Sequence, residues 1–284
     1  MYRERENNYM ARLKPLNDFI FQKLMGEKGS EDELRSFLSA VLGRELKSVT
    51  ILENKTLTPE IIGDKTSILD VRATTDDNTH INIEVQVKTY KHMDARSLFY
   101  WSKLFATALE AGSDYKELPN VVTINILDFE FIGLKRFHTK FHMWEDEERY
   151  LLTDKIATHF IEMPKFLRLA EKDIVNNPLH RWLTFFDSQA DETILKELIE
   201  MDSAIRKAHD RLNFLSTDKE FLHQANLRDI AMSDYNTDIN DAKDEVKLEI
   251  AVKLLRMDLP VSQVSEATGA DTAVIAEAKR RMKI

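Results

Sequence analysis

The chain has 284 residues and a net charge of −9, with 43% hydrophobic residues, 31% charged residues and no cysteine. This composition is typical of a soluble globular protein, and the lack of cysteine excludes disulfides and thiolate metal sites and favours a cytoplasmic protein. Residues 1–10 lack the hydrophobic stretch of a signal peptide, and no apolar run reaches the roughly 20 residues that span a bilayer, so no membrane is expected. Because nucleic-acid binding usually needs a basic surface, the acidity argues against DNA unless a local patch or a metal ion offsets it.

Helices and strands alternate in the first half of the chain. A helix is predicted within 13–25, and a capping-box pattern at Ser30 and Glu33 predicts a second helix that ends at Gly43. The elements predicted next are a strand at 49–52, a hairpin of strands at 67–74 and 79–88, a helix at 93–111 and an apolar strand at 120–127. Because the last strand has no polar face, we expect it to be buried on both faces of a sheet.

The hairpin at 67–88 brings two acidic residues together. Both strands alternate apolar and polar residues, and a turn at 76–78 places residues opposite each other when their numbers sum to 154. This register pairs apolar residues with apolar residues and places Asp70 opposite Glu84. Two carboxylates with Cβ atoms about 5 Å apart repel each other unless a positive charge lies between them. Mg²⁺ favours oxygen ligands, and the hairpin therefore predicts a metal site.

The second half of the chain becomes helical after a group of strands. The predicted strands are at 136–144, 150–153 and 157–163, and the predicted helices are at 166–173, 179–186, 194–215 and 217–257. The acidic run at 145–148 favours a solvated hairpin tip over a second metal site. His138 and His142 lie four residues apart in a strand with no third ligand, which argues against zinc. Trp144 and Trp182 are predicted to be core residues.

The last residues, 259–281, have the rhythm of a helix-turn-helix. Gly269 would make the tight turn and Asp271 would cap the second helix. Two interpretations stay open, a DNA reader or a small helical hairpin that packs or dimerises, because few side chains of the second helix would reach base edges. The basic residues at its end would contact phosphates, or would simply suit the helix dipole; they are Lys279, Arg280 and Arg281.

Four short blocks occur in order along residues 13 to 130. They are NDFIF at 17–21, LDVRA at 69–73, IEVQ at 83–86, and Arg96 followed by YWSK at 100–103. With these blocks the chain resembles the PD-(D/E)XK nuclease superfamily. It resembles more closely the bacterial Rpn group of recombination-promoting nucleases, also described as PD-(D/E)XK transposase-like proteins. The all-helical remainder is similar to that group as well.

The resemblance implies a restriction-endonuclease-like α/β core, in which helices flank a mixed central sheet, followed by an all-helical C-terminal region. The implied division is a nuclease-like domain at 10–165, a helical region at 166–258 and a helix-turn-helix-like segment at 259–284. The implied activity is cleavage of phosphodiesters with Mg²⁺ or Mn²⁺, with Asp70, Glu84 and the backbone carbonyl of Val85 as the metal ligands. The metal would activate water and stabilise charge on the scissile phosphate.

One position departs from the superfamily pattern. Gln86 stands where many superfamily members have a lysine, although the Rpn-like pattern also has glutamine there. Glutamine orients a water molecule by hydrogen bonding but supplies no charge. Three lysines are candidates for the missing charge, and the choice among them stays open; they are Lys65, Lys88 and Lys103.

The resemblance also includes auxiliary residues. Arg96, Tyr100 and Lys103 share one stripe of the helix at 93–111, and the stripe would face either the phosphate backbone or solvent. Asp18 would be an auxiliary carboxylate at the site or an N-terminal helix residue favoured by the dipole.

Two functions of different classes follow. The first is a metal-dependent DNA endonuclease linked to recombination, mobile elements or defence against foreign DNA, and a single site per chain suggests a homodimer when two strands are cut. The second is a catalytically weak or inactive nuclease-like domain that acts as a DNA-binding or oligomerising interaction protein. Acidity, the missing lysine and the long helical region motivate the second function.

Overall fold

The computed structural model describes residues 12–52, 70–108 and 114–282. By packing, the described residues up to Asn226 form one compact unit and those from Leu227 onward form a second. This division falls inside helix α9 (Lys219–Arg256). The division into 10–165, 166–258 and 259–284 stays a prediction. Within the described ranges, no helix combines the length and the apolar composition needed to cross a bilayer.

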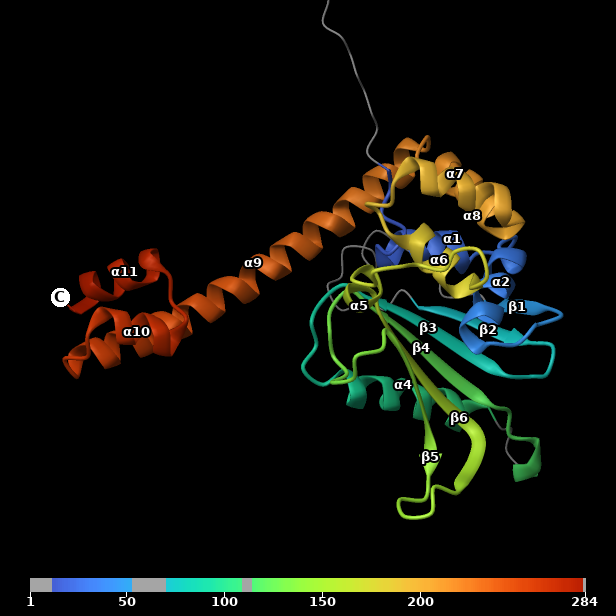
Figure 1. Ribbon diagram of the computed structural model, residues 1–284, viewed down its shortest axis with the longest axis horizontal. Coiled ribbons are helices and arrows are strands. Elements are labelled where there is room, and N and C mark those ends of the chain that lie inside the picture. The colour runs from blue at the N-terminus through green and yellow to red at the C-terminus, as the bar shows by residue number, and fades with distance from the viewer. Residues whose placement is uncertain (1–11, 53–69, 109–113, 283–284) are drawn as a thin grey trace, which may run out of the picture. The chain divides into compact units, whose positions relative to one another are not determined.

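The first unit is built on a mixed sheet, which in the described residues has six strands in the order β1-β2-β3-β4-β6-β5 (Figure 1). Strands β3, β4 and β6 run parallel, and the other neighbouring pairs are antiparallel. The strands are β1 (Val49–Leu52), β2 (Val71–Thr75), β3 (His80–Gln86), β4 (Val121–Leu127), β5 (His138–Trp144) and β6 (Leu151–Glu162). The mixed order confirms the predicted α/β class.

Helices cover both faces of this sheet (Figure 1). One face carries α1 (Asp18–Met25), α2 (Glu31–Leu42) and α6 (Pro178–Phe186), and the other carries α4 (Met93–Thr107). Every residue of β4 is buried, as its unbroken apolar run predicts. The main core lies on the α1 and α2 face and includes Phe37 and Trp182.

Helix α1 fixes the position of β2. The Asn17 side chain caps α1 by accepting hydrogen bonds from the backbone N–H groups of Phe19 and Ile20. At the other end, a Cβ added to Gly26 would lie 2.8 Å from Cγ2 of Val71. The end of α1 therefore touches the first residue of β2, directly beside Asp70.

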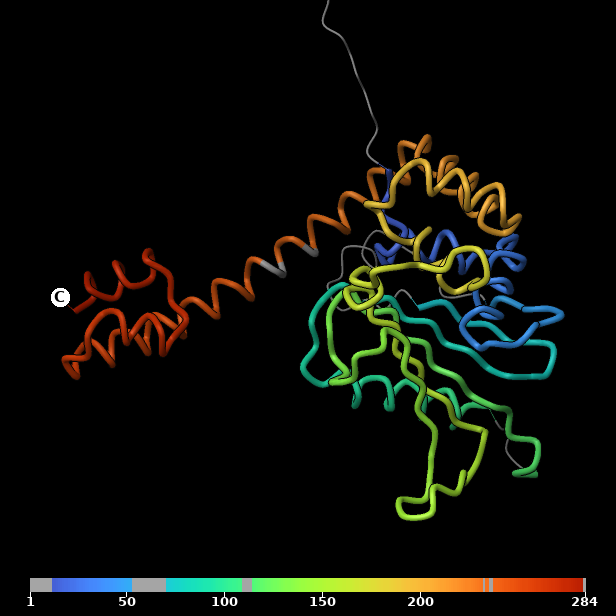
Figure 2. Tube along the Cα trace, viewed as in Figure 1, coloured from blue at the N-terminus to red at the C-terminus, as the bar shows by residue number. Residues whose placement is uncertain are grey.

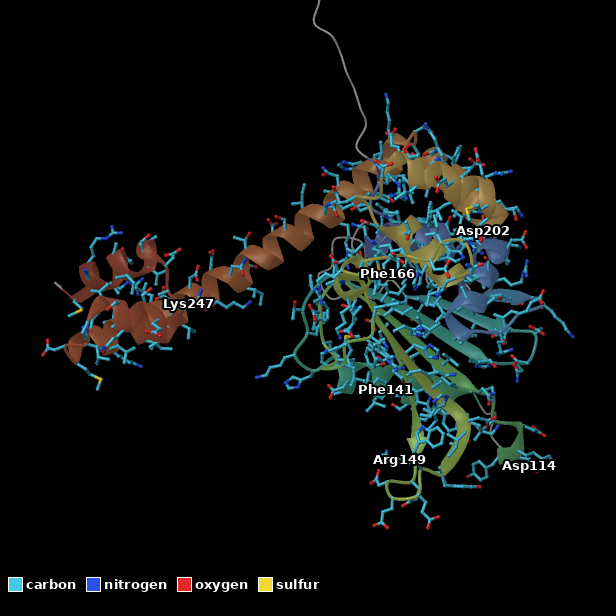
Figure 3. The ribbon with its side chains drawn as sticks, viewed as in Figure 1. Asp114, Phe141, Arg149, Phe166, Asp202 and Lys247 are labelled. Atoms are coloured by element: carbon cyan, nitrogen blue, oxygen red, sulfur yellow. The ribbon has the colours of Figure 1, made fainter. Side chains whose placement is uncertain are left out.

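The helices of the second half differ from the predicted ones at two places, since the helix predicted at 166–173 is the shorter and earlier α5 (Met163–Leu167). The predicted helix at 194–215 is two helices, α7 (Glu192–Met201) and α8 (Ser203–Leu215), and they follow α5 and α6. Asp202 separates α7 from α8 because its backbone is extended and its carboxylate accepts the N–H groups of Ala204 and Ile205 (Figure 3). A capping carboxylate begins a new helix even where the apolar spacing continues.

Three further expectations were wrong. The strands predicted at 150–153 and 157–163 are one strand, β6, which forms a long hairpin with β5 (Figure 2). Trp144 lies on β5 at the edge of the sheet and is 47% exposed, whereas Trp182 is buried as expected. Ser30 forms no side-chain cap, because its hydroxyl donates to the carbonyl of Glu27.

The second unit contains the end of α9 with α10 (Val261–Thr268) and α11 (Thr272–Met282). Gly269 has a φ of 62° and ends α10, and Asp271 accepts the N–H groups of Ala273 and Val274 at the start of α11. These are the predicted turn and cap. A small apolar cluster, separate from the main core, holds the three helices together.

Candidate active site at the β2 and β3 hairpin

The register of β2 with β3 is the predicted one. Val71 pairs with Ile83, and Ala73 pairs with Ile81, so the paired numbers sum to 154. Asp70 directly precedes β2, and the same register brings it beside Glu84 on β3. The two carboxylates therefore meet on the face of the sheet that α4 covers.

Both carboxylates are buried, and each binds an arginine. Asp70 is 4% exposed and Glu84 is 3% exposed. The Arg72 Nε lies 2.8 Å from Oδ2 of Asp70, and the Arg96 Nε lies 2.9 Å from Oε1 of Glu84. Burial raises the pKa of Glu84, the hydrogen bond and charge of Arg96 lower it, and the charge of Asp70 raises it further. Among the described residues, two arginines thus supply positive charge to the facing carboxylates.

Helix α4 holds Arg96 between two aromatic rings. The guanidinium carbon lies 4.9 Å from the ring centroid of Tyr90 and 5.2 Å from that of Tyr100. Burial raises the pKa of the Tyr100 hydroxyl, with Arg96 acting against it. The stripe of Arg96, Tyr100 and Lys103 was expected to face either the phosphate backbone or solvent. In the structure, Arg96 binds Glu84. Lys103 lies two turns further along α4 and is exposed.

The residues after Glu84 have distinct positions. The Gln86 Nε2 donates to Oε1 of Glu84 at 2.5 Å. The Gln86 carbonyl accepts the Asp128 N–H on the β4 side of β3. Because successive carbonyls of a strand point to opposite edges, the Val85 carbonyl points to the β2 side, where Asp70 lies. Lys88 is buried just after β3.

Asp18 and the C-terminal basic residues lie on elements other than the hairpin and α4. Asp18 is the first residue of α1, where its carboxylate accepts the Phe19 N–H, and its auxiliary role at the site stays a prediction. Lys65 lies outside the described residues. In the second unit, Arg281 binds Glu245 and Arg280 binds Glu277, so both guanidinium groups already have carboxylate partners. The third basic residue of that group, Lys279, is exposed on α11.

The oxygen donors fit a hard divalent cation. Glu84 accepts its three hydrogen bonds on Oε1, and its Oε2 accepts none from the residues that the structure describes. Asp70, Oε2 of Glu84 and the Val85 carbonyl would supply the oxygen ligands that Mg²⁺ and Mn²⁺ prefer. Among the described residues, no group of three or more His, Cys, Asp or Glu side chains could hold a metal ion, so the backbone carbonyl would be needed.

Three contacts were not predicted from the sequence. Alternation along the strand places Arg72 on the face that holds Asp70, but the ion pair between the two was not predicted. Tyr90 lies in a loop before α4, where residue spacing does not indicate which way a side chain points. His159 pairs with His138 across β5 and β6, with Nε2 of His138 3.0 Å from Nδ1 of His159, and sequence spacing within one strand does not reveal a contact between two strands.

The mixed sheet flanked by helices, with two buried carboxylates at the β2 and β3 hairpin, is the arrangement that the resemblance implied. A family model described as PD-(D/E)XK nuclease family transposase matches residues 15–242, so the chain belongs to that family. The mixed sheet, its flanking helices and the helical C-terminal part are consistent with a PD-(D/E)XK nuclease-like fold, as the resemblance implied. Searches among curated proteins and solved structures gave no match. PD-(D/E)XK nucleases generally use divalent metals.

Proposed function

We propose that the protein is a divalent-metal-dependent DNA endonuclease whose active site is the β2 and β3 hairpin. The observation that carries the proposal is the pair of buried carboxylates, Asp70 and Glu84, brought together at adjacent strand ends. Burying two acids side by side costs stability, which a fold would not retain at this place without a use for them. The family membership supports the same conclusion.

Each residue has a role in this proposal. Asp70, Glu84 and the Val85 carbonyl hold Mg²⁺ or Mn²⁺, which supplies Lewis-acid stabilisation of the scissile phosphate and a nucleophile from bound water. Gln86 orients the water by hydrogen bonding. Arg96 supplies the positive charge that the superfamily lysine would give. The guanidinium of Arg96 keeps its positive charge at any working pH, so in this role it needs no shift of its pKa.

The test is cleavage of a supercoiled plasmid with Mg²⁺, with Mn²⁺ and with EDTA. We expect wild type to nick or linearise the plasmid only with metal, and Glu84→Gln to lose at least 100-fold, about what removing one essential charged group costs in other enzymes. Glu117→Gln makes the same change at an exposed residue and should cleave like wild type. Calorimetric titration with Mn²⁺ gives a second readout, in which Glu84→Gln loses the binding that wild type shows. Wild type that neither nicks DNA nor binds Mn²⁺ would refute the proposal.

A second candidate function is an oligomerising interaction protein with a weak or inactive nuclease-like domain. It is favoured by apolar side chains exposed along one face of α9, opposite the face that packs on α10 and α11; these are Ile239, Val246 and Ile250. A homodimer is also compatible with the nuclease, because two sites cut two strands. Light scattering during size-exclusion chromatography measures whether the protein is a dimer. Together with the cleavage assay it distinguishes the two functions, since a dimer that does not cleave DNA supports only the second.

The biological setting belongs to the same proposal. Recombination, movement of mobile elements and defence against foreign DNA all require cleavage of phosphodiester bonds in DNA. The family description as a transposase favours the first two.

A further inference from the structure

Helix α4 and the loop before it are basic within an acidic protein. Residues 90–107 contain the cations Lys91, Arg96 and Lys103 and the single acid Asp94, whereas the whole chain has a net charge of −9. Lys91 and Lys103 are exposed, and neither forms an ion pair with a described residue. Because Arg96 is paired with Glu84, the two lysines are the charges that this segment offers to a polyanion, and the segment lies beside the acidic pair of the proposed active site.

An exposed aromatic side chain lies between two of these cations on α4. Phe99 is 61% exposed. It lies three residues after Arg96 and four residues before Lys103, so these three side chains share one face of α4. The ring centroid of Phe99 lies 5.6 Å from that of Tyr100, with the planes at 73°. Tyr100 in turn contacts Arg96, which binds Glu84. A chain of direct contacts thus connects the exposed ring with the acidic pair.

The chemistry of the ring restricts what it can bind. Phenylalanine has no hydrogen-bonding group for a phosphate, so a phosphate of a duplex backbone placed against the ring would lose water without gaining a partner. Nucleobases stack on aromatic rings, and an alternation of cations with aromatic rings is the pattern that binds single strands. In a duplex the faces of the bases are already stacked on each other, so only an unpaired base can reach the ring.

We propose that Phe99 is a stacking platform for an unpaired base next to the scissile phosphate, so that the substrate is single-stranded DNA or a duplex with unpaired bases at the cut. The inference rests on the proposed function for the position of that phosphate. Side chains at i and i+3 of a helix lie about 5–6 Å apart, which places the ring within one nucleotide of Arg96.

A protein partner fits this stripe less well. The apolar surface suited to such a partner lies on the other flank of α4, where Leu98 is 56% exposed and lines a cavity of about 360 Å³. Phe141 of β5 lines the same cavity (Figure 3). Phe99 does not line it, and its own flank carries cations. Leu98 therefore supplies a matched control, with the same helix and a similar exposure but no neighbouring cation stripe.

The test measures binding without cleavage. Fluorescence anisotropy in EDTA compares a labelled 20-nucleotide single strand with the duplex of the same sequence, for wild type, Phe99→Ala, Phe99→Trp and Leu98→Ala. We expect wild type to bind the single strand more tightly than the duplex, and Phe99→Ala to weaken single-strand binding about tenfold, the effect of losing one stacked base. Phe99→Trp should bind like wild type because indole also stacks, and Leu98→Ala should change nothing.

Salt dependence separates stacking from charge. Phe99→Ala should leave the slope of log affinity against log salt unchanged, whereas Lys103→Ala should reduce it by about 0.7. The inference is overturned if wild type does not prefer the single strand, if Phe99→Ala binds it like wild type, or if Leu98→Ala loses as much as Phe99→Ala. Because the assay contains no metal, these outcomes are distinct from failure of the cleavage experiment, which would refute the nuclease itself.

Discussion

At the scale of single residues, the acidic pair is held together by arginines. Arg96 contributes two donors to one oxygen of Glu84, and Arg72 contributes one to Asp70. Repulsion between the carboxylates, which the sequence pairing implies, is therefore offset inside the protein before any metal ion binds. Removing one arginine should expose how large that repulsion is.

Arg96→Ala is expected to lower the free energy of unfolding by about 1–3 kcal/mol, because it leaves the buried Glu84 carboxylate without its charged partner. Adding Glu84→Gln to Arg96→Ala should recover part of the loss, since the amide carries no charge. Urea denaturation at pH 7 measures both changes. Arg168→Ala is the control, because Arg168 pairs with Glu130 on the surface and should cost under about 1 kcal/mol. Equal losses for Arg96→Ala and Arg168→Ala would contradict this account.

At the scale of elements, the hairpin of β5 and β6 contains a pair of histidines that contact each other. Strand β5 is an edge strand, and it is joined to β6 by its ladder and by the contact of His138 with His159. Burial lowers the pKa of His138 to about 4 and that of His159 to about 3. Both imidazoles are therefore neutral when the protein is folded at neutral pH.

The hairpin is expected to lose stability as the pH falls below about 6.5, the ordinary histidine value. Between that pH and about 4, the unfolded chain binds protons that folded His138 and His159 do not bind, so the folded state loses up to about 1.4 kcal/mol per pH unit for each histidine. Urea denaturation at pH 7 and pH 5 measures the loss. His138→Gln should shrink the difference between the two pH values, and His92→Gln, at an exposed histidine, should leave it unchanged. A difference that His138→Gln does not alter would contradict the assignment.

At the scale of the whole molecule, the described residues of the first unit have a large core and a small satellite cluster around Met93, and those of the second unit have one small core. The first unit buries an extensive apolar core that includes Leu198, while the second depends on a few residues around Leu248. A small core leaves a unit marginally stable, so the two units need not unfold together.

Calorimetry of the full chain should therefore show two transitions. Leu248→Ala should lower the midpoint of the smaller transition alone, and Leu198→Ala that of the larger one alone, because each removes about 2–5 kcal/mol from one core. The two variants make the same chemical change and serve as controls for each other. A single transition that both variants shift equally would show that the units unfold as one.

The parts of the fold that could be predicted from the sequence depend on periodicity and turns. The register of the hairpin was predictable because a two-residue period and a polar turn fix which residues face each other, and Asp70 came beside Glu84 for that reason. The break between α7 and α8 at Asp202 was not predictable, because the apolar spacing of the helix continues through it. The binding of Arg96 to Glu84 was not predictable either, since it depends on how α4 lies over the sheet.

The layer between α4 and the sheet has a consequence for how DNA would reach the proposed active site. Within α4, all of which the structure describes, only Met93 and Ser97 are fully buried. Ser97 accepts a hydrogen bond from Asn125 of β4 and contacts Thr123, whereas Met93 packs in a small apolar cluster with Leu127 and Phe160. Water can replace such hydrogen bonds at little cost, whereas exposing an apolar core cannot be compensated in this way. Opening α4 locally would break the Arg96–Glu84 ion pair and the apolar cluster around Met93, but it would leave the main core folded.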